Sequence, residues 1–340
     1  MTSTPECGAE VRRDAEISTA ATPSDIATPS DIATPSDIAT PSDIATSSDI
    51  AAAPDIAAAP DIAAAPDIAA APDIAAAPNI AAAPNIAAAP NIAAAPDIAA
   101  FRARHAELAR GYYGAGDPDD PAMVQAMQMV LHLPKADPPP RSALLAAAAA
   151  AAVALCLDAR VGPGGEWEQP YLAWKHSRIR KVARRARGAQ WQAACAVPGV
   201  TVEVDGAQAR ALVPGPVGAV DPRIKRLQIG GTDLAHDDPG PPDPGSPVLW
   251  VNAGLGMTLG KSAAQAGHAS MLLAGALPVE NAQRWAELGF RCAVREAGAQ
   301  RWAALAQQVA EGGAVAVRDA GYTEVAPGSM TVIAVPAASW

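Results

Sequence analysis

The sequence predicts an α/β protein made of two tandem small units, each a mixed, roughly four-stranded sheet with helices on both faces, after a disordered N-terminal repeat tail. Two regions share one succession of apolar strand, Pro/Gly-rich loop and alanine-rich helix. Both regions continue through a similar series of strands and Gly turns, and the first hundred residues are mostly six-residue repeats. We expect a tail at 1–100, a first unit at 101–229, a linker at 230–246 and a second unit at 247–340.

The repeats run from Ala21 to Ile98 as thirteen units such as ATPSDI and AAAPNI. Nearly every unit contains a proline, which removes a backbone donor and disfavours helix at the preceding residue. One isoleucine per unit offers little apolar surface to offset the entropy of ordering. We therefore predict a disordered spacer. A hexapeptide β-solenoid is the alternative, and a proline in almost every rung argues against it.

Charge divides at the same boundary. The chain carries 35 acidic and 25 basic side chains, a net charge of −10, and the first 100 residues hold 14 of the acids and 2 of the bases. The remaining residues therefore hold 21 acids and 23 bases. The part that we expect to fold can thus favour an anionic partner.

No CxxC pair occurs among the scattered cysteines Cys7, Cys156, Cys195 and Cys292. The sequence therefore indicates no disulfide framework and no zinc site, and we expect neither metal nor cofactor. With an acidic N-terminus that lacks an apolar signal segment, this pattern predicts a cytoplasmic protein. The alanine-rich run at residues 143–157 is too short and too weakly apolar to span a bilayer, so we predict a buried helix and no membrane partner.

The two units align without a gap at an offset of 120 residues. The first reads QMVLHLPKADPPPRSALLAAAAA from residue 128, and the second reads VLWVNAGLGMTLGKSAAQAGHAS from residue 248. At the positions where the second has Lys261, Gln265 and His268, the first has Arg141, Leu145 and Ala148. The first unit has therefore lost most of this polar face.

The first unit adds a basic run, KHSRIRKVARRAR, at residues 175–187. Spacings of three and four residues would place its guanidinium groups on one side of a helix, and the nearby Trp174 and Trp191 could stack on bases. A solvated helix face is the alternative. We favour a basic helix that binds nucleic-acid phosphates through Arg178, Arg180, Lys181, Arg184, Arg185 and Arg187.

Lys261, Gln265 and His268 are spaced i, i+4, i+7 and share one face of the predicted helix. They could form the wet side of an amphipathic helix. A second polar cluster, RDAGYTEVAPGSMTV, follows an apolar strand at residue 318, and ligands bind in α/β proteins where strands end and helices begin. We therefore predict a cleft in which Asp319 pairs with Lys261.

The loop GLGMTLGKS resembles a phosphate-binding P-loop, which needs the pattern G-x-x-x-x-G-K-[ST]. Leu255 occupies the position of the first glycine, and Gly254 and Gly256 lie on either side of it. The spacing argues against a nucleotide site.

Together, LGMTLGKSAAQAGHA and RDAGYTEVAPGSMTV resemble the archaeal/eukaryotic-type peptidyl-tRNA hydrolases, whose signatures are approximately MGKGKxAAQxxHA and DAGxTQxxPGTxTV. The resemblance covers about residues 247–336, and the decayed upstream copy is similar to a two-part form from high-GC bacteria. It implies a mixed four-stranded sheet with helices on both faces, and hydrolysis of the ester that joins a nascent peptide to the tRNA 3′ ribose. The departures from the motifs are Leu259 and Glu324, where the family has Lys and Gln, and Asn252 and Gly254 near the strand end.

Carried over to this chain, the resemblance implies catalytic roles for Lys261, Asp319, Thr323 and His268, and substrate-binding roles for Gln265, Ser329 and Thr331. We expect Asp319, with Thr323, to orient or deprotonate a water while Lys261 stabilises the oxyanion and the leaving oxygen. His268 could instead be hydrogen-bonded inside the core.

The family often forms dimers, and here the upstream copy could take the partner's place. We therefore predict a monomer with an internal pseudo-dimer, acting on peptidyl-tRNA. A non-catalytic tRNA- or ribosome-binding module is the alternative function, favoured by the departures at Leu259 and Glu324 and by the basic first copy.

Overall fold

The computed structural model describes residues 98–111, 116–231 and 233–340, all within one structural unit, Pro84–Trp340. The predicted disorder of residues 1–97 therefore lies outside the described residues. Residues 98–100, which we assigned to the tail, instead begin helix α1, Ile98–Ala109. Phe101 and Leu108 of α1 are buried in the main core, so this segment folds with the rest of the unit.

The first sheet has the strand order β2-β1-β4-β3, and a short fifth strand, β5, pairs with β1. Its strands are β1 (Gln125–His132), β2 (Arg180–Ala186), β3 (Gly199–Val204), β4 (Ala207–Leu212) and β5 (Gly215–Pro216). β1 runs parallel to β2 and antiparallel to β4, so the sheet is mixed. Helix α2 (Arg141–Leu157) covers one face, and α4 (Ala189–Cys195) packs on the other through Trp191.

The second sheet repeats this order and these pairing directions as β7-β6-β9-β8. Its strands are β6 (Val248–Asn252), β7 (Ala293–Ala297), β8 (Val315–Arg318) and β9 (Met330–Val335). Helix α6 (Leu259–Ala276) covers one face, and α8 (Ala299–Ala310) covers the other. The predicted mixed four-stranded sheet between helices is confirmed for this region.

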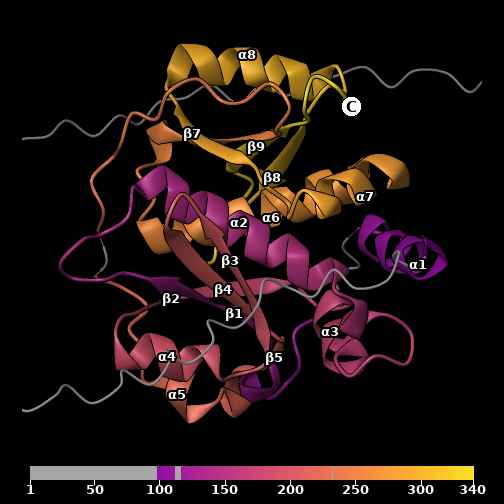
Figure 1. Ribbon diagram of the computed structural model, residues 1–340, viewed down its shortest axis with the longest axis vertical. Helices are drawn as coiled ribbons and strands as arrows, with labels where there is room; N and C mark the ends of the chain where they lie inside the picture. The colour runs from indigo at the N-terminus through magenta and orange to yellow at the C-terminus, as the bar shows by residue number, and fades with distance from the viewer. Residues whose placement is uncertain (1–97, 112–115, 232) are drawn as a thin grey trace, which may run out of the picture. The chain divides into compact units, whose positions relative to one another are not determined.

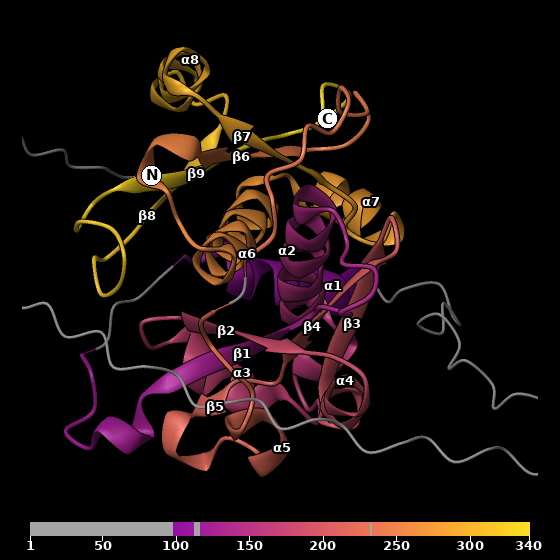
Figure 2. The same cartoon turned by 90° about the vertical axis from the view of Figure 1, so that its left-hand side faces the viewer.

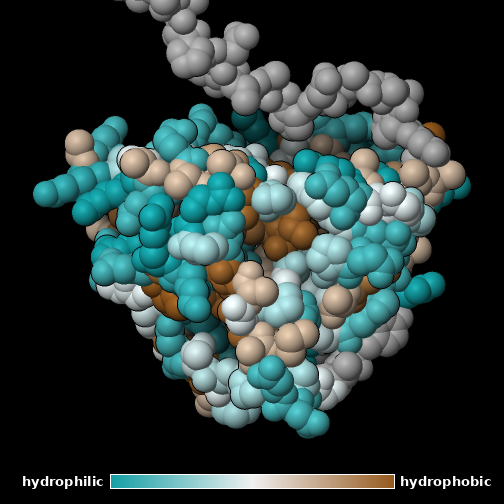
Figure 3. Space-filling model, turned by 90° about the horizontal axis from the view of Figure 1, so that it is seen from below, coloured by the Kyte–Doolittle hydropathy of each residue, from teal (hydrophilic) through white to brown (hydrophobic). Residues whose placement is uncertain are grey.

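Short elements connect these parts. The remaining α-helices are α3 (Glu168–Lys175), α5 (Pro222–Lys225) and α7 (Val279–Glu287), and the 3-10 turns are η1 (Pro121–Met123), η2 (Ala159–Val161), η3 (Val217–Ala219) and η4 (Ala253–Leu255). Within the described ranges, no helix is long and apolar enough to cross a membrane. The face seen from below in Figure 3 is covered mostly by polar residues, with apolar residues in a hollow near its centre.

Helices α2 and α6 lie side by side between the two sheets, so the layers run α8, second sheet, α2 with α6, first sheet, α4 (Figures 1 and 2). This position explains the alanine-rich run: α2 is buried along most of its length, as predicted, and small side chains let helices and sheets approach closely. At the contact, Ser270 Oγ donates to the Ala149 carbonyl oxygen at 2.8 Å. A Cβ on Gly267 would lie 3.1 Å from the Ala152 Cβ. The two halves of the chain therefore share one core.

The prediction of a basic helix is wrong. Residues 180–186 form β2, an edge strand whose register against β1 runs from Ala126 opposite Arg180 to His132 opposite Ala186. Charged side chains are common on edge strands because they discourage pairing with another chain. The predicted base-stacking by Trp174 and Trp191 is also wrong, since their exposed fractions are 0% and 4%.

Candidate active site

The site begins where α6 begins. Gly256 adopts φ +56° at the end of the turn after β6, and Thr258 then caps the helix by accepting from the Lys261 N–H at 3.2 Å. Leu259 is fully buried in the core. The cap therefore fixes Lys261 in the first turn of α6, facing the end of β8.

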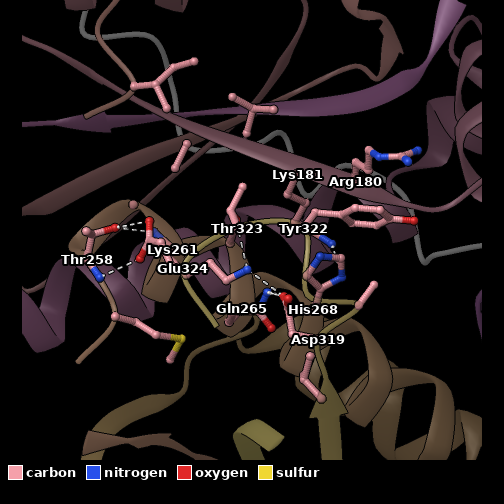
Figure 4. Close-up of a pocket in the computed structure, with 18 of the residues that line it drawn as sticks. Arg180, Lys181, Thr258, Lys261, Gln265, His268, Asp319, Tyr322, Thr323 and Glu324 are labelled. Carbon is pink, nitrogen blue, oxygen red and sulfur yellow. Dashed lines mark hydrogen bonds and ion pairs between the residues drawn. The ribbon is translucent and has the colours of Figure 1, made fainter. Parts of the chain in front are cut away.

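Asp319 is the centre of the site, immediately after β8. Its Oδ2 accepts from Lys261 Nζ and from Gln265 Nε2, both at 2.7 Å, and its Oδ1 accepts from the Gly321 N–H at 2.8 Å (Figure 4). Gly321 has φ +80°, and a Cβ there would collide with the Pro327 ring. The loop can therefore turn back onto the carboxylate only with glycine at this position.

Two threonines complete the network from opposite sides. Thr323 is exposed, and its Oγ1 accepts from Lys261 Nζ at 3.2 Å. Thr331 is fully buried in β9 and donates to Gln265 Oε1 at 2.6 Å, which points the Gln265 amide nitrogen at Asp319. The hydroxyl of Thr331 cannot touch a substrate, so the structure contradicts its direct binding role and makes it a support for Gln265.

Ser329 is also removed from direct contact. Its carbonyl oxygen accepts from the Asp319 N–H at 2.9 Å, and its side chain is not among the residues that line the cleft. Ser329 therefore shapes the loop through its backbone.

Lys261, Gln265 and Asp319 lie on the wall of a cleft of about 1100 Å³. One side comes from α6 and the loop between β8 and β9, and the other from β2 and residues 229–231 of the first unit. The predicted ion pair therefore forms inside a cavity to which both halves of the chain contribute.

The basic run divides between the cleft and the rest of the first unit. Arg178, Arg180 and Lys181 line the cleft. Arg184 points to the other side of the sheet, where it donates to Gln128 Oε1 and the Leu227 carbonyl. Arg185 donates to Gln228 Oε1 and the Gly231 carbonyl, so the predicted substrate contacts through Arg184 and Arg185 have no support in these positions.

Arg187 lies outside both groups. It follows β2, is exposed, and does not line the cleft. Its predicted substrate contact has no support either.

Lys181 and His268 join the two halves inside the cleft, with Lys181 Nζ 3.0 Å from His268 Nδ1. An ammonium group can only donate, so a protonated Lys181 leaves the His268 proton on Nε2. Burial lowers the pKa of Lys181 to about 7. Burial, with the charges of Lys181 and Lys261, holds the pKa of His268 well below its usual range. His268 is therefore a neutral, half-buried group on the cleft wall.

Glu324 occupies the N-terminus of α6. It has φ +61°, and its carboxylate accepts from the Thr258 N–H at 3.0 Å and from Thr258 Oγ1 at 2.9 Å. An acid at a helix N-terminus is stabilised by the helix dipole. The departure from Gln thus places a negative charge at the start of α6.

Sequence reasoning missed Thr258, Tyr322 and Asp117. A threonine directly before a helical pattern is a known start signal and could have identified Thr258. Tyr322 stood inside the second motif as an aromatic residue between Gly and Thr. Asp117, which pairs with Arg180 at 2.7 Å, carried no signal because their contact depends on how the chain packs.

Within the described part of the chain, no group of three or more His, Cys, Asp or Glu side chains could hold a metal ion. Residues 246–339 match the protein-family model described as Peptidyl-tRNA hydrolase PTH2. The match supports a peptidyl-tRNA hydrolase domain of this type, containing the second sheet and the Asp319 network. No curated protein and no solved structure matches the chain.

Proposed function

We propose that this protein hydrolyses the ester bond of peptidyl-tRNA, yielding free tRNA and an N-substituted amino acid or peptide. The observation that carries the proposal is the Lys261–Asp319 ion pair, held by Gln265 and Thr323 on the cleft wall within the region that matches the family. The side chains of the pair are only 8% and 9% exposed, so solvent screens it weakly. The reaction needs no metal or cofactor in this scheme.

In the proposed reaction, a water molecule attacks the carbonyl carbon of the ester. Asp319, with Thr323, orients the water and takes its proton, which then passes to the 3′ oxygen as the carbon–oxygen bond breaks. Lys261 stabilises the negative charge on the carbonyl oxygen and on the leaving oxygen. General-base help contributes roughly 10²- to 10⁴-fold, and one electrostatic donor about 3–4 kcal/mol of barrier. His268 adds an Nε2–H donor on the same wall.

The first unit supplies binding in this proposal. Arg178 and Arg180 face the cleft, and their charges suit the tRNA backbone next to the ester. The repeated strand order supports an origin of the two units by tandem duplication, with the first as a degenerate copy. A cytoplasmic location follows from the substrate.

The test is cleavage of N-acetylaminoacyl-tRNA by the full chain and two variants. We expect Asp319→Ala and Lys261→Ala to lower kcat by at least about 10²-fold, because each removes one partner of the ion pair. Lys135→Ala, which removes an exposed lysine outside the cleft, is the matched control. Full activity of Lys261→Ala would exclude the assignment.

A tRNA-binding module without turnover is the second candidate. It is favoured by Leu259, whose buried side chain offers no cation, and by Glu324 at the start of α6. If the folded wild-type protein binds the tRNA and leaves the ester intact, the chain is a binding module. The Asp319→Ala variant should then bind the tRNA as tightly as wild type.

A further inference from the structure

An exposed aromatic ring stands at the cleft, next to the Asp319 network. Tyr322 lies in the loop between β8 and β9 and is 54% exposed. Five other large apolar side chains in the described ranges are similarly exposed, and each of them is aliphatic: Ile98, Met123, Ile229, Leu272 and Leu288. Tyr322 directly precedes Thr323, which accepts from Lys261 Nζ, so the ring is one residue away from the proposed reaction centre.

Two guanidinium groups of the other half of the chain flank this ring. The Arg180 Cζ lies 5.0 Å and the Arg178 Cζ 5.8 Å from the ring centroid, and Arg178 Nη1 donates to the Tyr322 hydroxyl. Figure 4 shows the ring beside Arg180. Both distances are within the range of cation–π contacts. These contacts hold the ring in place, while more than half of the surface of Tyr322 remains exposed to solvent.

The local charge balance is positive. Asp117 is the carboxylate that pairs with both arginines, at 2.7 Å from Arg180 Nη1 and 3.8 Å from Arg178 Nε. Two guanidinium groups share one carboxylate, so these three side chains together carry a positive charge. A surplus of positive charge beside an open aromatic ring is the combination that binds single-stranded nucleic acid, in which bases stack and phosphates pair with arginine.

We propose that Tyr322, Arg178 and Arg180 form a subsite for the terminal nucleotide of the single-stranded tRNA 3′ end, with its base stacked on Tyr322 and its 5′ phosphate bound by the arginines. This inference rests on the proposed function, because the ester and the base are attached to the same ribose. With the ester at Lys261 and Asp319, the base of that nucleotide must lie within one sugar ring of the reaction centre. Tyr322 is the ring at that place, and the phosphate-binding groups come from β2.

The test of stacking compares two small esters with the full chain. One is 3′-O-(N-acetylaminoacyl)adenosine, and the other is the same ester on a ribose without a base. We expect Tyr322→Ala to lower the ratio of kcat/KM for these two esters by about 5- to 100-fold, and Tyr322→Phe to keep the ratio within about 3-fold of wild type. An unchanged ratio for Tyr322→Ala would overturn the stacking role, even if both rates fall together.

A binding measurement keeps the inference separate from the hydrolase proposal. The probe is the amide analogue of the adenosine ester, which is not cleaved, prepared with and without a 5′ phosphate. We expect Tyr322→Ala to weaken both forms and Arg180→Ala to weaken the phosphorylated form by about 5-fold or more, while the exposed Arg226→Ala matches wild type. Weakened binding without ester cleavage by wild type keeps the subsite and removes the hydrolase. If wild type cleaves the ester but Tyr322→Ala binds the probe as tightly as wild type, the hydrolase proposal stands and the subsite is excluded.

Discussion

At the residue scale, the geometry of Asp319 depends on a hydrogen-bond chain that starts in the core. Thr331 Oγ1 donates to Gln265 Oε1, and Gln265 Nε2 donates to Asp319 Oδ2. An amide side chain has two nearly equal orientations, and both of these contacts favour the same one, because the carboxylate needs a donor and the Thr331 hydroxyl supplies one to the amide oxygen. The buried Thr331 therefore reinforces the orientation in which the Gln265 nitrogen meets the carboxylate.

Thr331→Val tests this chain because the two side chains have nearly the same shape. The change leaves Gln265 Oε1 without its donor, which costs about 1–3 kcal/mol of stability for a buried acceptor. We expect kcat to fall several-fold with little change in KM, and the melting temperature to fall. Thr201→Val on β3 is the control, because it removes a threonine hydroxyl that accepts from Arg210 Nη1 outside the cleft. A variant with the kcat of wild type would show that Gln265 keeps its orientation without Thr331.

The pH dependence of folding should report Lys181. Its pKa is about 7 in the folded protein, because it is buried, and about 10.4 in an unfolded chain. Above about pH 7 the unfolded chain thus holds a proton that the folded protein has lost, so this group adds stability as pH rises. Below about pH 7 both states hold the proton, and the folded protein bears the full cost of the buried charge.

Lys181→Met removes this titration. We expect the free energy of unfolding of wild type, relative to Lys181→Met, to increase between about pH 6.5 and 8.5, as measured by urea unfolding. Burial raises the pKa of Cys156 to about 12, and Cys156 is present in both proteins, so its effect largely cancels in the comparison. A difference that is constant over this range would mean that Lys181 titrates near its ordinary value.

At the element scale, the sequence predicted more about α6 than about β2. The i, i+4, i+7 spacing placed Lys261 and Gln265 on one face of α6 correctly, since a helix fixes its own periodicity. For β2, arginines three and four residues apart fit a helix as well as an edge strand, and only the pairing with β1 decides. The second wall of the cleft was not predictable, because it depends on the packing of α2 against α6.

The strand β2 should control the salt dependence of tRNA binding. If Arg178 and Arg180 contact phosphates, replacing both with alanine should reduce the slope of log K against log salt by about 1 to 2. Arg226→Ala should leave the slope unchanged, because Arg226 lies on the surface away from the cleft. Binding of labelled tRNA across a series of KCl concentrations measures the slope. Equal slopes for all three proteins would place the phosphates elsewhere.

The contact between α6 and α2 gives a second test at this scale. Gly267→Ala would bring its Cβ to 3.1 Å from the Ala152 Cβ, which has no rotamer to escape, so we expect a loss of about 1 kcal/mol or more. In the same helix, Gly260→Ala meets its nearest atom, the Ala183 Cβ, only at 3.6 Å. We expect that change to be neutral or stabilising, since alanine favours helix. The comparison is measured by thermal unfolding of both variants. Equal stabilities would mean that α2 and α6 move apart without cost to make room for the added methyl group.

At the scale of the whole molecule, the shared layer of α2 and α6 explains why one chain can contain the complete cleft. α6 contacts β2 as well as β8 and β9, and α2 contacts β7 as well as β3 and β4, so each helix packs on both sheets. Arg141 of α2 donates to Glu296 Oε1 at 3.1 Å and to the Met257 carbonyl, which ties the start of α2 to the second unit. The first unit covers the face of α6 that packs on α2 and β2, so a second copy of the chain has no access to that face.

We therefore expect the full chain to be a monomer of 34.3 kDa by light scattering. A fragment of residues 246–340 would lack the β2 wall and expose the buried residues of α6, among them Ala263, Ala266 and Met271. Apolar surface of this kind is covered in solution, so the fragment should self-associate. It should also lose most tRNA affinity, because Arg178 and Arg180 are absent. A full chain that dimerises, or a fragment that stays monomeric and keeps wild-type affinity, would mean that the first unit is not the internal partner of the second.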